Sequence, residues 1–87
     1  MKYGMEKKWY KDGKIKMERQ YYNGMKINIH KGWWENEKLK YRYVFDNNGR
    51  YNGKVEEWYV NGQKLREFNY TKGLENGKQK LWDYFNR

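Results

Sequence analysis

Hydrophobic and polar residues alternate with a period of two over short segments of this chain. The clearest segment is "LKYRYVF" (39–45), which places Leu39, Tyr41, Tyr43 and Phe45 on one face of an extended strand. These segments are rich in tryptophan, tyrosine, phenylalanine, valine and isoleucine, the residue types that suit a pleated surface. Nine glycines interrupt the chain, and each apolar run is short, so a helical reading is weak. The pattern therefore predicts an all-β chain of short strands.

The alternating segments belong to a repeated unit. Tryptophans recur at intervals of 24, 25 and 24 residues, namely Trp9, Trp33, Trp58 and Trp82. Five residues before each tryptophan stands a glycine or an asparagine, namely Gly4, Asn28, Gly53 and Gly77. A turn pair follows each of the first three, namely Asp12-Gly13, Asn36-Glu37 and Asn61-Gly62. We expect one domain over residues 1–87, with units 4–27, 28–52, 53–76 and a truncated 77–87.

Two strands per unit predict a single elongated antiparallel meander sheet of about seven strands, built from β-hairpin repeats. The four repeat tryptophans are expected at equivalent strand positions, mostly buried on one face as a ladder. Gly13 and Gly62 are expected to have positive φ in two-residue loops, and Glu37 to be strained or to sit in a different turn. Asn28 replaces an opening glycine and tolerates positive φ. Gln63 reads as an extra residue that forms a bulge.

The residue types that are missing exclude most catalytic chemistry. The chain has no cysteine, serine, alanine or proline, and its only threonine is Thr71. Disulfides, thiolate metal sites and serine or thiol nucleophiles are therefore excluded. The single histidine, His30, is expected at the surface rather than as a base. The pairs Glu35/Glu37 and Glu56/Glu57 do not suit a glycosidase dyad. We expect no enzyme activity, no cofactor and no metal.

Targeting signals and disorder are also not favoured. The N-terminus "MKYGMEKKWYKDGK" has no apolar run, and no window approaches a membrane span, so a cytoplasmic protein of a bacterium or a phage-infected cell is expected. Aromatic residues make up 21% of the chain, whereas disordered chains are poor in aromatics. The chain is therefore expected to fold, with aromatic side chains in place of aliphatic ones in its core.

The charge of the chain points to an acidic partner. The formal net charge is +9, of which residues 1–42 carry +7 and residues 43–87 carry +2. A lysine-rich solvated face with charged edges is one interpretation. Attraction to an acidic protein surface, a nucleic acid or a lipid head group is the other. The candidate partner-binding residues combine two aromatic anchors with four cations, namely Trp34 and Tyr43 with Lys31, Lys38, Lys40 and Arg42.

The segment "GKVEEWYVNGQKLREFNYTKG" (53–73) resembles the MORN repeat variant family, whose units read approximately G-x4-[WY]-Y-x-N-G-x-L-K-x-E-x-x-Y-x-x-G. The resemblance covers essentially the whole chain. It implies a long antiparallel sheet of stacked hairpins with no shared catalytic residues. Many bacterial members are similar to the YwqK-type group, which is labelled as antitoxins.

These features favour a non-catalytic protein-binding module, a small inhibitor or neutraliser of a partner protein. An antitoxin-like protein and a phage anti-defence protein, for example an inhibitor of the anti-CRISPR type, are two forms of this hypothesis. The expected partner is a protein with an acidic surface or a nucleoprotein complex. The alternatives are a basic nucleic-acid-binding protein, since lysines are interleaved with aromatics, and a membrane-surface MORN module, which here has neither an amphipathic helix nor a lipidation motif.

Overall fold

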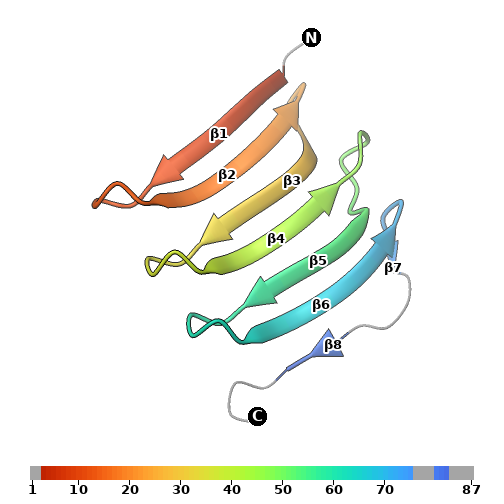
Figure 1. Cartoon of the computed structure of the whole chain (residues 1–87). Helices are drawn as coiled ribbons and strands as arrows, with labels where there is room; N and C mark the ends of the chain where they lie inside the picture. Colours follow the sequence, from red (N-terminus) through yellow and green to blue (C-terminus); the bar gives the residue numbers. More distant parts are fainter. Residues whose placement is uncertain (1–2, 76–79, 83–87) are drawn as a thin grey trace.

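The computed structural model describes residues 3–75 and 80–82, and this part of the chain contains strands and no helix (Figure 1). The strands are β1 (Tyr3–Trp9), β2 (Ile15–Tyr22), β3 (Met25–Trp33), β4 (Leu39–Phe45), β5 (Gly53–Trp58), β6 (Lys64–Thr71), β7 (Leu74–Glu75) and β8 (Lys80–Leu81). They form one open antiparallel sheet in which β1 to β7 follow one another in chain order. The meander expected from the sequence is confirmed.

The sheet is a single layer. Its Cα atoms extend over 46 × 39 × 11 Å, so among residues 3–75 and 80–82 only side chains cover its two faces. β1–β2, β3–β4 and β5–β6 are the three hairpins, whereas the expected seventh strand consists of two short segments. β7 and β8 both pair with β6, through Thr71 opposite Leu74 and through Arg66 opposite Leu81. β7 and β8 therefore lie along the outer side of β6, while β1 forms the other end of the described sheet.

The loops inside the three hairpins have three residues, not the two that the sequence suggested. Tyr10 N donates to Lys14 O at 2.8 Å and Gly13 N donates to Tyr10 O at 3.0 Å, with Gly13 at φ 92°. The same pair of hydrogen bonds closes the loops that start at Trp34 and Tyr59. A turn followed by a left-handed residue is the usual three-residue hairpin loop.

Glu37 takes the left-handed place of this loop in the second hairpin, at φ 70°. The expected strain is therefore present, but the turn is the same as in the other two hairpins. The two-residue loops lie at the opposite ends of the strands. Asn23-Gly24 has φ values of 50° and 80°, and Lys72-Gly73 has values of 50° and 83°. Asn28 has positive φ, at 59°, as its tolerance for that conformation predicts.

A register shift recurs at the loop end of each hairpin. Trp9 pairs with Ile15, Trp33 with Leu39 and Trp58 with Lys64, each directly after the shift. These three tryptophans thus hold equivalent positions, as expected. Lys64 takes the place of Ile15 and Leu39, so the interpretation of Gln63 as an extra residue is wrong. The residues skipped by the pairing are Lys16, Lys40 and Leu65.

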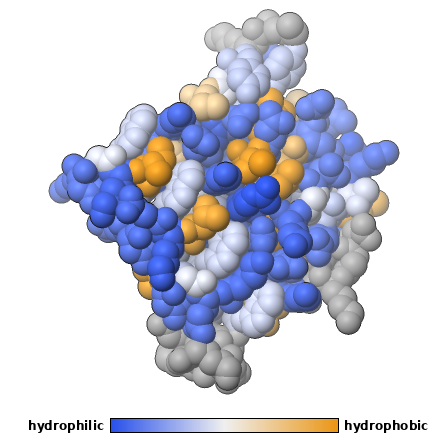
Figure 2. Space-filling view, in the orientation of Figure 1, coloured by the Kyte–Doolittle hydropathy of each residue, from blue (hydrophilic) through white to orange (hydrophobic). Residues whose placement is uncertain are grey.

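The expected burial of the four tryptophans is wrong. Trp9 is 58% exposed and Trp82 is 37% exposed, while Trp33 and Trp58 are partly buried. A single layer offers no opposing sheet to bury a row of indoles, and Trp9 lies on the terminal strand. In the view of Figure 2, residues of high hydropathy form separate spots among hydrophilic ones rather than one continuous patch.

The aromatic ladder of the sheet is built from other rings. Tyr21, His30, Phe45, Tyr51 and Tyr70 contact one another in that order, with centroid distances of 5.4, 4.7, 5.0 and 5.0 Å. These rings come from four strands and the β4–β5 connection. His30 is only 2% exposed, so the expectation of a surface histidine is wrong. Cross-strand ring contacts of this kind stabilise a sheet that has no second layer.

Candidate functional site

The strand register divides the predicted binding residues between the two faces of the sheet. Tyr43 pairs with His30, and Lys31 pairs with Arg42, one residue away on each strand. Neighbouring residues of a strand point to opposite faces. We call the face with His30, Tyr41, Tyr43 and Glu57 the tyrosine face, and the face with Glu18, Lys31, Arg42 and Glu56 the charged face. The sequence placed these candidates in one site, and the fold does not.

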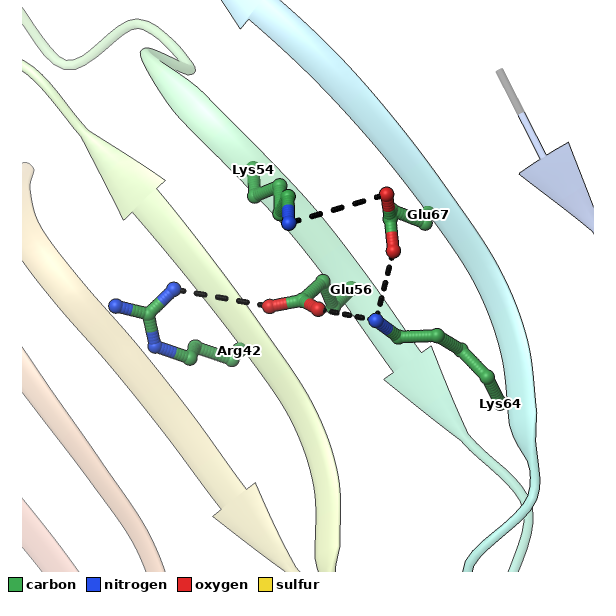
Figure 3. A network of polar contacts seen from close by, with 5 residues as sticks. All are labelled: Arg42, Lys54, Glu56, Lys64 and Glu67. Atoms are coloured by element: carbon green, nitrogen blue, oxygen red, sulfur yellow. Dashed lines mark hydrogen bonds and ion pairs between the residues drawn. The ribbon is translucent and has the colours of Figure 1, made fainter. Parts of the chain in front are cut away.

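The charged face carries a row of charged partners across the strands, in the order Lys7, Glu18, Lys31, Arg42, Glu56 and Glu67. Figure 3 shows its centre, where Arg42 lies 3.7 Å from Glu56 and Lys64 bridges Glu56 and Glu67. Glu56 is buried, at 8% exposure. Arg42 is therefore engaged in neutralising a buried carboxylate, which is costly to leave without a partner.

The pKa directions agree with this network. Burial alone lowers the pKa of Lys64, but its hydrogen bonds to Glu56 and Glu67 outweigh burial and raise it. The hydrogen bond from Lys64, at 2.7 Å, holds the pKa of Glu67 below its usual value. The charges at the centre of the charged face are thus compensated within the protein.

The tyrosine face contains two neighbouring hollows that share Lys40 and Tyr41. The first, of about 220 Å³, is lined by Trp34, Lys40, Tyr41, Tyr43, Glu57, Trp58 and Leu65. The second, of about 140 Å³, is lined by Tyr10, Lys16, Met17, Arg19, Trp33, Lys40 and Tyr41. We call the two together the basic-aromatic groove. Three predicted residues meet here, namely Trp34, Lys40 and Tyr43.

The groove repeats one arrangement of a lysine over an aromatic ring. Lys16 Nζ lies 5.6 Å from the ring centre of Tyr10, and Lys40 Nζ lies 4.7 Å from that of Trp34. Both lysines are the residues skipped by the strand pairing, and both are exposed. In the third hairpin the skipped residue is Leu65, and the lysine over a ring is Lys64 instead, 5.4 Å from the ring centre of Trp58. The sequence alone did not single out Tyr10 and Lys16, although their spacing from Trp34 and Lys40 is one repeat.

Trp34 also joins two hairpins. Its Nε1 donates to the carbonyl of Trp58 at 3.3 Å. Tyr10 donates in the same way to Trp33 O at 2.6 Å, and Tyr59 donates to Trp82 O at 3.1 Å. This inter-unit hydrogen bond gives the residues that follow Trp9, Trp33 and Trp58 a structural role. The ring of Trp34 therefore lines the groove, while its indole N–H donates a hydrogen bond within the protein.

Tyr43 is held firmly in place. Its ring stacks on Tyr41 with centroids 4.8 Å apart, and its hydroxyl donates to the carboxylate of Glu57. Burial and this carboxylate raise the pKa of Tyr43. Arg66 Nε lies 3.0 Å from the same Glu57 carboxylate. The aromatic floor of the groove is thus preorganised.

A close approach under Tyr41 was also missed by sequence reasoning. A Cβ on Gly32 would lie 2.2 Å from Cε2 of Tyr41, so the ring packs on the glycine backbone. Arg19 Nη2 donates to the Tyr41 hydroxyl at 3.3 Å, which fixes the far end of the ring. Gly32 interrupts the turn-glycine pattern of the repeat, and this irregularity was the available signal.

The remaining predicted residues lie outside the groove. Lys31 and Arg42 belong to the charged face, and Lys38 lies in the hairpin loop, where its Nζ donates to Asn61 O at 3.3 Å. Across residues 3–75 and 80–82, no group of three or more histidine, cysteine, aspartate or glutamate side chains is arranged to hold a metal ion. The same residues contain no helix with the length and apolar character that a membrane crossing needs.

Comparisons with known proteins leave the site to be interpreted from its own geometry, since no protein-family model, curated protein or solved structure matches the chain.

Proposed function

We propose that the protein is a non-catalytic protein-binding module, a small inhibitor or neutraliser that uses the basic-aromatic groove to hold an acidic surface of its partner. The observation that carries this proposal is a repeated cation–π contact, of Lys16 with Tyr10 and of Lys40 with Trp34. Each ring positions an exposed ammonium beside an apolar surface. A carboxylate of the partner would meet the ammonium while the apolar atoms around it cover the aromatic rings.

The occupied ring faces favour a protein partner over a nucleic acid. Single-stranded nucleic acids bind through bases that stack on free aromatic faces. In the groove, Tyr41 and Tyr43 stack on each other and Lys40 covers Trp34. The net charge of +9 is the observation that favours the nucleic-acid alternative, because it attracts any polyanion.

The repeated hairpins and the resemblance of residues 53–73 to MORN repeat variant units support membership of that family as part of this proposal. An antitoxin-like protein and a phage anti-defence inhibitor of the anti-CRISPR type both fit such a module. Action in the cytoplasm of a bacterial or phage-infected cell belongs to the same proposal. A membrane-surface role is a weaker alternative, since it has no specific contact in its favour.

The test compares charge reversal inside and outside the groove. The partner is captured from a bacterial lysate, purified, and titrated with the wild type and two double variants. Lys16→Glu/Lys40→Glu should weaken binding by about tenfold or more. Lys38→Glu/Lys72→Glu changes the net charge equally at two exposed loop lysines, and it should change the affinity by about twofold or less.

Binding to the partner and to random single-stranded RNA is then compared at about 0.05 M and about 0.5 M NaCl, because screening separates the two classes of ligand. Partner binding through desolvated rings should persist at the higher salt concentration, while RNA binding should be lost. Equal affinity for both ligands at low salt, with both lost together at high salt, would reject the protein-binding proposal in favour of nucleic-acid binding.

A further inference from the structure

Each repeat unit begins with a strand, namely β1, β3, β5 and β8. Among the described strands, β1 alone of these four has no neighbour from a preceding hairpin. β3 lies beside β2, β5 beside β4, and β8 beside β6, so in each case the second strand of one hairpin covers the first strand of the next unit. β1 stands at the end of the strand order, and no described strand lies on its other side. The chain thus shows three times what occupies the edge that β1 leaves open.

Two features recur at those three contacts. The residue two positions before each repeat tryptophan has an opposite charge across from it, since Lys31 faces Glu18, Glu56 faces Arg42 and Lys80 faces Glu67. The carbonyl of the tryptophan accepts a side-chain hydrogen bond from the preceding hairpin, as described above. The matching groups on β1 are Lys7 and the carbonyl of Trp9.

The side chains of β1 are exposed in a way that suits a missing neighbour. Tyr3 is 61% exposed, Met5 52% and Trp9 58%, whereas Trp33 and Trp58 at the equivalent of Trp9 are partly buried. Tyr3, Met5, Lys7 and Trp9 alternate along the strand and so share one face. An edge strand with several exposed apolar side chains is a template for pairing with another strand.

A second copy of the chain fits this edge poorly. The twofold antiparallel register that pairs all of Tyr3–Trp9 is centred on Glu6 and places two Glu6 side chains opposite each other. Like charges directly across a strand pair are destabilising. Each copy also has a net charge of +9, so two copies repel each other.

We propose that the edge of β1 binds an extended acidic segment of a partner protein as an added antiparallel strand, with a carboxylate of that segment opposite Lys7. Backbone hydrogen bonds along β1 supply affinity, and alternate side chains of the segment cover Tyr3, Met5 and Trp9. Lys7 and Lys8 favour the negative charge of the segment. This site is separate from the basic-aromatic groove, because neither Lys7 nor Lys8 lines the two hollows.

The probe is a capped synthetic peptide with the sequence of residues 15–22, the strand that covers β3, carrying Lys16→Glu to make it acidic. In the β2–β3 pair, Glu18 lies opposite Lys31. Lys7 is the residue of β1 that corresponds to Lys31, so the same register places Glu18 of the peptide opposite Lys7. Amide hydrogen exchange is measured on the full chain with and without peptide. Protection should appear at alternate amides of β1, those directed away from β2, and sedimentation should show one chain per peptide.

A double-mutant cycle tests the charge contact. Lys7→Gln in the chain should weaken binding of the peptide by about three- to fivefold, and should have no effect on a peptide that carries Glu18→Gln. Lys16→Glu/Lys40→Glu in the chain should leave the affinity for the peptide within about twofold of the wild-type value. The experiment therefore distinguishes failure of this proposal from failure of the proposed function of the groove. Absence of protection in β1 at saturating peptide, equal effects of Lys7→Gln on both peptides, or dimerisation through β1 would each overturn the proposal.

Discussion

His30 should make the stability of the protein depend on pH below about pH 6.5. The ring is buried between Tyr21 and Phe45, and its Nε2 lies 2.8 Å from Gln20 O, to which it donates. Burial lowers the pKa of His30, and the nearby positive charges of Arg19 and Lys26 lower it further, although the hydrogen bond to Gln20 opposes them. The folded protein therefore favours the neutral imidazole.

The direction and the size of the effect follow from proton linkage. An unfolded histidine has a pKa of about 6.5, so below that pH the unfolded chain binds a proton that the folded chain resists. The stability is fully present above about pH 6.5 and is lost as the pH falls through the folded pKa, with a limiting slope of about 1.4 kcal/mol per pH unit. The protein has no other histidine, and no other side chain with an ordinary pKa changes its charge between about pH 5.5 and 7.5.

The matched variant is His30→Phe, which keeps a ring between Tyr21 and Phe45 but removes the donor to Gln20 O. At pH 7.5 it should be less stable by about 1–3 kcal/mol, because the part-buried carbonyl of Gln20 loses a hydrogen-bond donor. Urea unfolding, followed by tryptophan fluorescence at pH 7.5, 6.5 and 5.5, gives the free energy of unfolding of both proteins. The difference between wild type and variant should shrink as the pH falls. A constant difference, or a variant that is more stable at pH 7.5, would refute this account of the buried imidazole.

Two further changes test the backbone geometry. Glu37→Gly should raise the free energy of unfolding by about 0.5–1 kcal/mol, because glycine adopts the left-handed conformation of this position without strain. The control is Glu35→Gly, in the same loop but outside the left-handed position, which should not raise the melting temperature. Gly32→Ala should lower the free energy of unfolding by about 1–3 kcal/mol, because the added methyl group overlaps the Tyr41 ring. The control is Gly4→Ala, whose methyl group meets no atom within 4 Å and which should leave the melting temperature nearly unchanged. Equal effects of the two substitutions would contradict the close packing of Tyr41 on Gly32.

The residues of the proposed groove show which part of the candidate site could not be predicted from the sequence. Trp34, Lys40 and Tyr43, which were grouped as anchors and a cation, line one groove, and their role in binding stays a prediction. Lys31 and Arg42 were grouped with them, but strand alternation puts them on the opposite face. Lys16 and Tyr10 join the groove from a different hairpin, and only the lateral pairing of β2 with β3 brings the two hairpins together.

The strands and their order in the meander could be predicted from the sequence. Alternation with a period of two, recurring tryptophans and turn residues are local signals, and local hydrogen bonds and backbone conformations decide hairpins. The tertiary structure alone decided which aromatics are buried. A ladder of Tyr21, His30 and Phe45 depends on the register between strands that are many residues apart, and that register is set by bulges and cross-strand packing. Burial of His30 and exposure of Trp9 follow from position in the sheet, which no single segment of sequence contains.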